Sequence, residues 1–322
     1  MERVVDPTTQ KGSALRAQSQ TIAFVVMTVA LVIAPFVTYP LFVMQALCFA
    51  LFACAFNLLI GYVGLMSFGH ALYFGWASYI SAHAAKVWGL PPELAILVGT
   101  VTAAVLGLIA GSLAIRRQGI YFAMITLALA QMMYFVALRA KFTGGEDGIQ
   151  AVPRGTLLGL FDLRNDMTMY VLVLVVFLGG MLVIHRIIHS PFGEVLKAIR
   201  ENETRAISLG YKTDNYKLLA FVLSATLAGV AGATKAILLQ IASLTDVNWP
   251  MSGEVVLMSL VGGLGTIFGP VVGSFVILAM QYKLAFMGEW VLVIQGVIFV
   301  ACVLLFRRGI VGEIAHRLHI KL

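Results

Sequence analysis

Long runs of residues without charge are the feature that most limits what this chain can fold into. The stretch from Thr21 to Thr38 contains no charged residue, and comparable apolar stretches recur through the rest of the chain. An α-helix needs about 20 consecutive apolar residues to cross a bilayer. Charges, proline and glycine bound the segments, and we predict ten spans, over residues 21–38, 41–63, 64–85, 93–115, 119–139, 167–188, 218–240, 251–267, 270–286 and 289–306.

Composition supports a membrane protein. Of the 322 residues, 60% are hydrophobic and 11% are charged, whereas soluble domains are about 45–50% apolar and about 25% charged. We therefore expect an all-α polytopic membrane protein with about ten transmembrane helices (eight to ten). The same numbers exclude a secreted disulfide scaffold. The basic residues are scattered and form no dense stripe, so no nucleic-acid partner is expected.

The distribution of basic residues predicts the orientation of the chain. Most of the 22 lysines and arginines fall in the inner segments if both termini lie in the cytoplasm, as the positive-inside rule requires. We expect a cytoplasmic tail over residues 1–20, a membrane domain over 21–306 and a second cytoplasmic tail over 307–322. The membrane domain would carry an external loop over 140–166 and a cytoplasmic loop over 189–217.

The cytoplasmic loop has the signals of short helices. Ser190 is a good N-cap and Pro191 suits the first helical position, so a first helix should begin there. A second should run from about Glu203 to Leu209 and stop at Gly210, which is a natural residue for the end of a helix.

Two glycine-rich segments have similar spacing, Gly61-Tyr-Val-Gly-Leu-Met-Ser-Phe-Gly69 and Gly262-Gly-Leu-Gly-Thr-Ile-Phe-Gly269. Paired glycine interruptions in the two halves of a transporter indicate broken helices beside a central path. Glycines that let helices pack closely would explain the same pattern. On the first interpretation, the candidates for the translocation path are Gly61, Gly64, Ser67, His70, Gly262, Gly265 and Pro270.

Charged residues within the predicted spans are few, and Lys235 and Glu254 stand out. Lys235 could extend outward to water, with Glu254 at the membrane interface. Alternatively, the two side chains form an ion pair that fixes an outer gate. Both interpretations stay open at this point.

Motifs for enzymatic chemistry are missing from the sequence. No glycine is followed by lysine, so the chain has no phosphate-binding P-loop and we do not expect it to hydrolyse ATP. The histidines and cysteines lack the spacing of a metal site. We therefore expect no catalytic residue, no metal and no cofactor in this chain.

Several ordered motifs together resemble the branched-chain amino acid ABC permeases of the LivM type. They extend over Asn57–Gly75, Gly119–Ala128, Thr143–Gly148, Ser190–Tyr211 with Tyr216–Ala225, Gly262–Pro270 and Arg308–Gly312. The resemblance implies an ABC importer permease fold in a bacterial-type inner membrane. It also implies a second homologous permease subunit, two cytoplasmic ATPase subunits that bind ATP, and an external substrate-binding protein.

In such permeases a short cytoplasmic helix docks on the ATPase, and the resemblance assigns this role to the segment containing Glu203, Ala206 and Gly210. The glutamate stands one position earlier than in the common Glu-Ala-Ala form of the motif. The implied function is inward translocation of branched-chain or related amino acids. Alternatives are a permease of the same family for urea, amides or another small solute, a self-contained secondary transporter, or a structural subunit of a membrane enzyme complex.

Overall fold

Helices make up most of the computed structural model, which describes residues 7–157, 159–288, 290–305 and 309–317. Within these ranges the side chains of residues 7–20, 291–292, 302–303, 305 and 314–317 are not described. The helices are α1 (Pro7–Val37), α2 (Pro40–Asn57), α3 (His70–Lys86), α4 (Pro92–Ala114), α5 (Ile120–Arg139), α6 (Asp166–Ile188), α7 (Pro191–Glu201), α8 (Glu203–Ser208), α9 (Thr213–Leu239), α10 (Trp249–Gly262), α11 (Gly269–Leu284), α12 (Trp290–Leu305) and α13 (Gly309–Arg317).

Short elements connect the helices. A π-helix, η1 (Leu58–Val63), continues α2, and the 3-10 turns are η2 (Lys141–Thr143), η3 (Leu244–Asp246) and η4 (Ala285–Met287). Four two-residue strands pair antiparallel as β1 (Ile149–Gln150) with β4 (Ile241–Ala242), and β2 (Thr156–Leu157) with β3 (Phe161–Asp162).

Six apolar helical segments are long enough to cross a membrane. They are Pro40–Val63, Pro92–Ala114, Ile120–Arg139, Asp166–Ile188, Thr213–Leu239 and Gly269–Met287, and α1 adds a shorter apolar stretch over Thr21–Val37. These segments confirm a helical, multi-pass membrane protein. Ten crossings and their orientation remain predictions.

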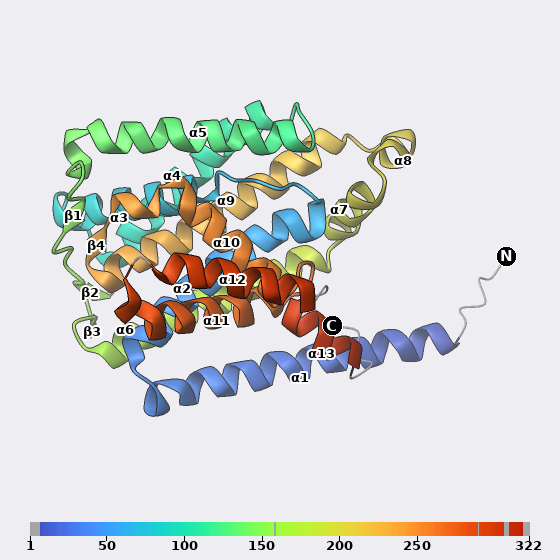
Figure 1. Cartoon of the computed structure of the whole chain (residues 1–322), viewed down its shortest axis with the longest axis horizontal. Coiled ribbons are helices and arrows are strands. Elements are labelled where there is room, and N and C mark those ends of the chain that lie inside the picture. The colour runs from blue at the N-terminus through green and yellow to red at the C-terminus, as the bar shows by residue number, and fades with distance from the viewer. Residues whose placement is uncertain (1–6, 158, 289, 306–308, 318–322) are drawn as a thin grey trace.

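The two ends of the bundle differ in structure. Helices α7, α8 and α13 and the beginning of α1 lie at one end, and the four short strands lie at the other (Figure 1). The first and last described helices thus share one end, as an even number of crossings requires. The predicted cytoplasmic loop and external loop lie at opposite ends.

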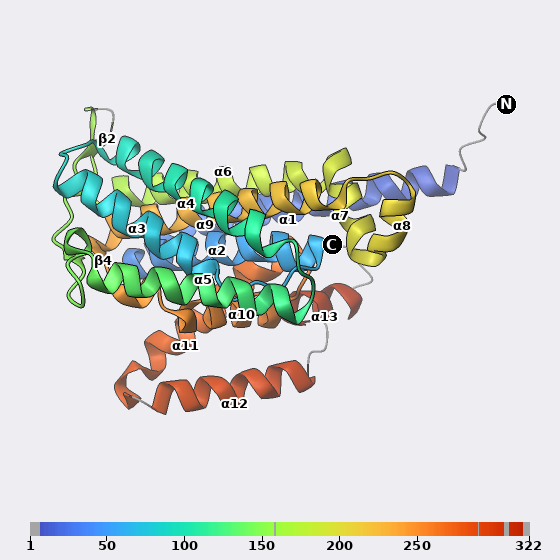
Figure 2. The ribbon, with the colours of Figure 1, turned by 90° about the horizontal axis from the view of Figure 1, so that it is seen from above.

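Helices α2 and α9 form the centre of the bundle. In the most apolar window of each, 89% and 72% of residues are buried, against 28% for α5. Alanine and glycine are frequent on α9, and small residues let helix backbones approach closely in lipid. Helix α12 instead stands apart from the rest of the bundle (Figure 2).

Several predicted boundaries were wrong. The span predicted over 64–85 begins only at His70, because residues 64–69 form a non-helical break, and α10 ends at Gly262 rather than at residue 267. Helix α9 begins at Thr213, inside the predicted loop. Helix α1 begins at Pro7, inside the segment predicted as a tail.

The predicted C-terminal tail also contains a helix. Helix α13 packs against α10 and α11, and the backbone of Gly309 lies against that of Gly263. The remaining parts of the predicted tails, residues 1–6, 307–308 and 318–322, lie outside the described residues.

Candidate translocation and coupling site

The two glycine-rich segments lie side by side. Residues 64–69 separate η1 from α3, and residues 263–268 separate α10 from α11; we call them the first and second break. The Asn57 amide, at the end of α2, binds the second break, since its Nδ2 donates to the Thr266 carbonyl at 2.8 Å and its Oδ1 accepts from the Gly265 N–H at 3.0 Å. A Cβ on Gly61 would lie 2.8 Å from the Gly265 nitrogen, so this approach requires glycine.

Arg200 from α7 reaches the same point. Its Nη1 donates a hydrogen bond to the Gly61 carbonyl, which lies in the last turn of η1, where carbonyls have no partner within the helix. The same nitrogen lies 3.4 Å from where a Cβ on Gly265 would be, and the Arg200 Cγ lies 3.2 Å from the equivalent point on Gly64. A helix of the predicted cytoplasmic loop therefore contacts both breaks.

The first break is held by several other helices. The Thr126 hydroxyl of α5 accepts from the Phe68 N–H at 3.2 Å, and the Ser252 hydroxyl of α10 accepts from the Ala71 N–H at 2.9 Å. These bonds satisfy backbone donors at the start of α3 that have no helical partner. Ser67 is fully buried and accepts from the Gly69 N–H.

His70 bridges three helices from a fully buried position. Its Nε2 lies 2.8 Å from the Ser224 Oγ, which in turn lies 2.5 Å from the Ala55 carbonyl. Because a hydroxyl has one proton and a carbonyl can only accept, Ser224 donates to Ala55 and His70 donates through Nε2. Aromatic rings of Phe56, Tyr73 and Phe221 surround the imidazole. In this conformation Ser67 and His70 therefore lie in a packed core.

The second break is capped by its own residues. The Thr266 hydroxyl donates to the Gly263 carbonyl at 2.8 Å and accepts from the Gly269 N–H at 3.1 Å. Gly262 packs against the backbone of Gly269 and Pro270. These contacts close the turn locally, at the start of α11.

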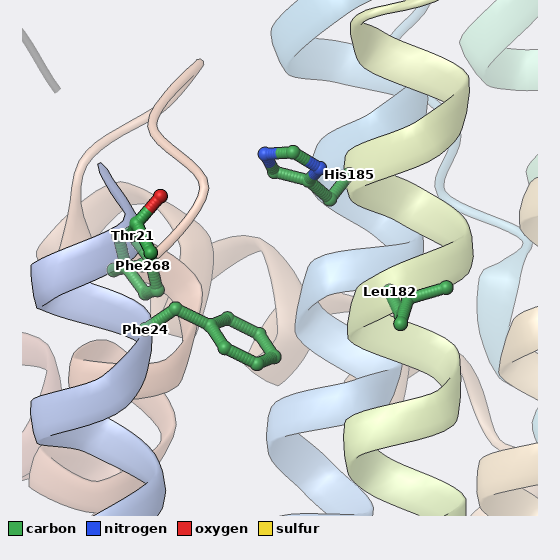
Figure 3. Close-up of a pocket in the computed structure, with 5 residues that line it drawn as sticks. All are labelled: Thr21, Phe24, Leu182, His185 and Phe268. Atoms are coloured by element: carbon green, nitrogen blue, oxygen red, sulfur yellow. The ribbon is translucent and has the colours of Figure 1, made fainter. Parts of the chain in front are cut away.

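A pocket adjoins the second break. Phe268 lines it together with Thr21 and Phe24 of α1 and Leu182 and His185 of α6, around a cavity of about 170 Å³. Figure 3 shows α1 and α6 facing each other across this space, with Phe268 beside Thr21. The second break thus borders an unfilled space between α1 and α6.

The loop over residues 189–217 forms the two predicted short helices. The Ser190 hydroxyl caps α7 by accepting from the Gly193 N–H, and the Asn202 side chain caps α8 by accepting from the Arg205 N–H. Helix α8 runs over Glu203–Ser208 and is followed by Gly210 at φ +90°. Both predicted helices and the stop at Gly210 are confirmed.

Glu203 and Ala206 both face the body of the protein. Glu203 Oε1 pairs with Lys217 and accepts from the Thr213 hydroxyl at 3.1 Å, while Oε2 accepts from Gln118 at 3.0 Å. Ala206 is 2% exposed, whereas the neighbouring Leu209 is 71% exposed. Among the exposed side chains of Glu203–Gly210, Ile207 and Leu209 are the large apolar ones, and the sequence motif did not indicate them.

At the opposite end of the bundle, Lys235 pairs with Asp246 of η3. Both side chains are buried, and the lysine also lies over the rings of Phe49 and Phe74. The structure thus differs from both interpretations of Lys235, because η3 folds over α3 and places Asp246 nearer than Glu254. Glu254 instead hydrogen-bonds to Gln281 of α11.

Three residues of these networks were missed as site residues: Asn57, Arg200 and Asp246. Asn57 gave one usable signal, because it is polar in an apolar run and lies four residues before Gly61, on the same helix face. Arg200 lies in a loop with several other charges, and Asp246 lies outside the predicted spans, so neither stood out. Among the described residues, no cluster of three histidine, cysteine or acidic side chains could hold a metal ion.

Known proteins similar to this chain are transport permeases. It is similar to the high-affinity branched-chain amino acid transport system permease protein LivM of Escherichia coli (strain K12), with 25% identity over 82% of this chain and 68% of that protein. LivM of Salmonella typhimurium is 24% identical over the same shares. The probable branched-chain amino acid transport permease protein LivH of Methanocaldococcus jannaschii is 26% identical over 73% of this chain and 79% of that protein.

No solved structure matches the chain. The family model described as branched-chain amino acid transport system / permease component matches residues 40–303. This range contains both breaks, the cytoplasmic loop and the Lys235–Asp246 pair. The chain therefore belongs to the family of permease components of branched-chain amino acid transport systems.

Proposed function

We propose that this chain is a membrane-spanning permease subunit of an ABC importer, which moves branched-chain or related amino acids inward in a bacterial-type inner membrane. ATP would be bound and hydrolysed by two partner subunits in the cytoplasm. A second, homologous permease subunit would complete the path, and an external binding protein would deliver the substrate. The family match and the similarity to LivM and LivH support this assignment.

The observation that carries the proposal is the exposed surface of the cytoplasmic loop. Leu209 and Ile207 are exposed although they are apolar, and Leu209 borders an apolar groove that Val195, Ala198 and Tyr216 also line. An exposed apolar patch on a short capped helix is typical of a docking site for another protein. We assign it to the ATPase.

Glu203 and Gly210 would set the position of this surface. Glu203, at the start of α8, forms an ion pair with Lys217 of α9, and Gly210 turns the chain back toward α9. A rigid attachment is required, because a flexible loop would absorb a displacement instead of transmitting it. A state-dependent contact with the ATPases would then bias the permease between two conformations.

Transport should be tested with the complete complex in proteoliposomes. We expect uptake of radiolabelled leucine, isoleucine or valine that requires both ATP and the loaded binding protein. If these amino acids are not taken up but urea or an amide is, the substrate assignment is wrong and the importer assignment survives. Uptake driven by an ion gradient without ATP would overturn the importer assignment.

The docking surface should be tested with Leu209→Asp, and Ser208→Asp is the matched control. Both changes add a carboxylate to the exposed side of the α8 region, but only the first removes an apolar anchor. We expect Leu209→Asp to reduce co-purification of the ATPases by about tenfold or more, since a central anchor residue contributes about 2 kcal/mol or more to binding. Co-purification of Leu209→Asp at the level of Ser208→Asp would contradict the assignment. Gly210→Pro should also uncouple transport, because proline cannot adopt φ +90°.

A further inference from the structure

We propose that Arg200 and Asn57 form a clasp that makes helix α7 and the two breaks move as one unit. A displacement of the cytoplasmic helices would then reach the membrane helices through Arg200, and not only along the chain from α7 into α6. This inference rests on the proposed function, since it concerns how a docked ATPase would move the permease.

Arg200 supplies the contact between the cytoplasmic helix and the membrane core. Its guanidinium donates to the Gly61 carbonyl, a group that the π-helix leaves without a helical partner. The donor is charged, and such hydrogen bonds are roughly twice as strong as neutral ones. The stem of Arg200 also packs over Gly64, where a side chain would displace it.

Asn57 extends this contact to the second break. The side-chain amide of Asn57 donates to the Thr266 carbonyl and accepts from the Gly265 N–H, which are neighbouring backbone groups. Arg200 bonds to Gly61 and approaches Gly265 closely. The two side chains therefore hold three segments that lie far apart in the sequence.

An unfilled space beside the second break leaves room for it to follow the clasp. Its own turn is closed by Thr266, so its internal hydrogen bonds can survive a displacement. Gly309 of α13 packs against Gly263 at one point, but Phe268 borders the pocket that it shares with α1 and α6 (Figure 3). A dense core resists displacement, whereas this space can accept it.

The first test separates transport from ATP hydrolysis in the reconstituted complex. Arg200→Gln removes the charged donor and leaves the exposed docking residues Ile207 and Leu209 unchanged. We expect uptake to fall by at least about tenfold while ATP hydrolysis stays within about twofold of the unaltered protein. Arg200→Lys retains a charged donor and should recover part of the uptake.

Lys197→Gln is the matched control, because Lys197 lies on the same helix and, within the described part of the chain, its ion pair is with the exposed Glu194. It should leave both rates unchanged. Unchanged uptake in Arg200→Gln would overturn the clasp. So would an equal fall in uptake and hydrolysis in an assembled complex, because Arg200 would then act through docking.

A second test keeps the clasp intact and does not depend on whether Arg200→Gln assembles. Spin labels on Lys197→Cys and Leu264→Cys report the distance between α7 and the second break. We expect this distance to change by less than about 2 Å between the nucleotide-free and ATP-trapped complexes, below the scale of typical helix shifts. A label pair on Lys197→Cys and Leu160→Cys, the latter in the opposite loop, should show a clear change.

A larger change in the 197–264 distance, with the clasp residues unaltered, would overturn the inference. Failure of the proposed function gives a different result. In that case the unaltered complex shows no ATP-dependent uptake of any amino acid, and the uptake comparison between variants does not arise. The distance measurement then still decides whether α7 and the second break move together when the complex binds ATP.

Discussion

Helix α9 has a buried lysine near each end, and the two lysines hold their neighbouring loops differently. Near its C-terminal end, Lys235 pairs with Asp246, and these side chains are 8% and 1% exposed. Near its N-terminal end, Lys217 pairs with Glu203, and these are 3% and 22% exposed. Lys235 binds Asp246 Oδ1, and the buried Oδ2 has no hydrogen-bond partner among the described residues, whereas Glu203 also accepts from Thr213 and Gln118.

The two ion pairs therefore differ in how easily they rearrange: Lys235–Asp246 is a permanent ion pair, and Lys217–Glu203 is an adjustable one. A fully buried ion pair cannot exchange partners with water, so breaking it leaves an uncompensated charge in the core. The acceptor of the N-terminal pair is partly exposed and has further donors, so it can shift with little loss. The adjustable pair lies at the end where α8 would meet the ATPase. Of the four predictions below, which run from the largest expected effect to the smallest, the two lysine variants test this contrast directly and the other two test neighbouring contacts.

Lys235→Met should destabilise the protein most. It leaves Asp246 buried without its cation, which costs about 3–5 kcal/mol of unfolding free energy. The double variant Lys235→Met with Asp246→Leu should recover much of this loss, because it buries no charge. Denaturant unfolding in detergent micelles measures both. If the double variant is no more stable than the single one, the loss comes from packing and not from the unpaired charge.

Gly61→Ala should come next. Its Cβ would lie 2.8 Å from the Gly265 nitrogen, and overpacking of this kind costs about 1–3 kcal/mol. Gly179→Ala is the control, since a Cβ at Gly179 meets no atom within 4 Å. The two variants should differ in melting temperature in detergent. Equal melting temperatures would show that the breaks are not in close contact.

Lys217→Met should have a smaller effect than Lys235→Met. Glu203 keeps Thr213, Gln118 and contact with water, so the expected loss is about 1–2 kcal/mol. The same denaturant unfolding experiment measures the loss of unfolding free energy in both lysine variants, so the two ion pairs of α9 can be compared directly. If Lys217→Met lost as much unfolding free energy as Lys235→Met, the distinction between a permanent and an adjustable ion pair would be wrong.

Ser190→Ala should have the smallest effect on stability. It removes the hydroxyl that caps α7, and the loss of such a cap typically costs about 1 kcal/mol. Ser208→Ala is a suitable control, because Ser208 only bonds back to the Thr204 carbonyl within α8. Hydrogen exchange of the α7 amides should speed up in the first variant and not in the second. Unchanged exchange would mean that packing, and not the cap, holds the start of α7.

Local signals were the ones that sequence reasoning used correctly. The N-cap at Ser190 and the stop at Gly210 act within a few residues, so the start of α7 and both ends of α8 were predicted close to where they are observed. The paired breaks were one of the two interpretations of the glycine spacing, beside close packing of helices. The beginning of α3 was missed, since residues 64–69 are as apolar as a helix, and only their contacts with Thr126 and other helices satisfy the extended backbone.

The amino-acid sequence by itself determined that this chain is a multi-pass helical membrane protein with a structured loop over residues 189–217, because apolar length and helix caps depend on nearby residues alone. Tertiary structure decided which partners the few polar groups find. Lys235 had two acids nearby in sequence, and the fold of η3 over α3 selected Asp246. Arg200 lies 139 positions from Gly61, and they meet because a carbonyl left free at a helix end in a buried place needs a donor from another part of the chain.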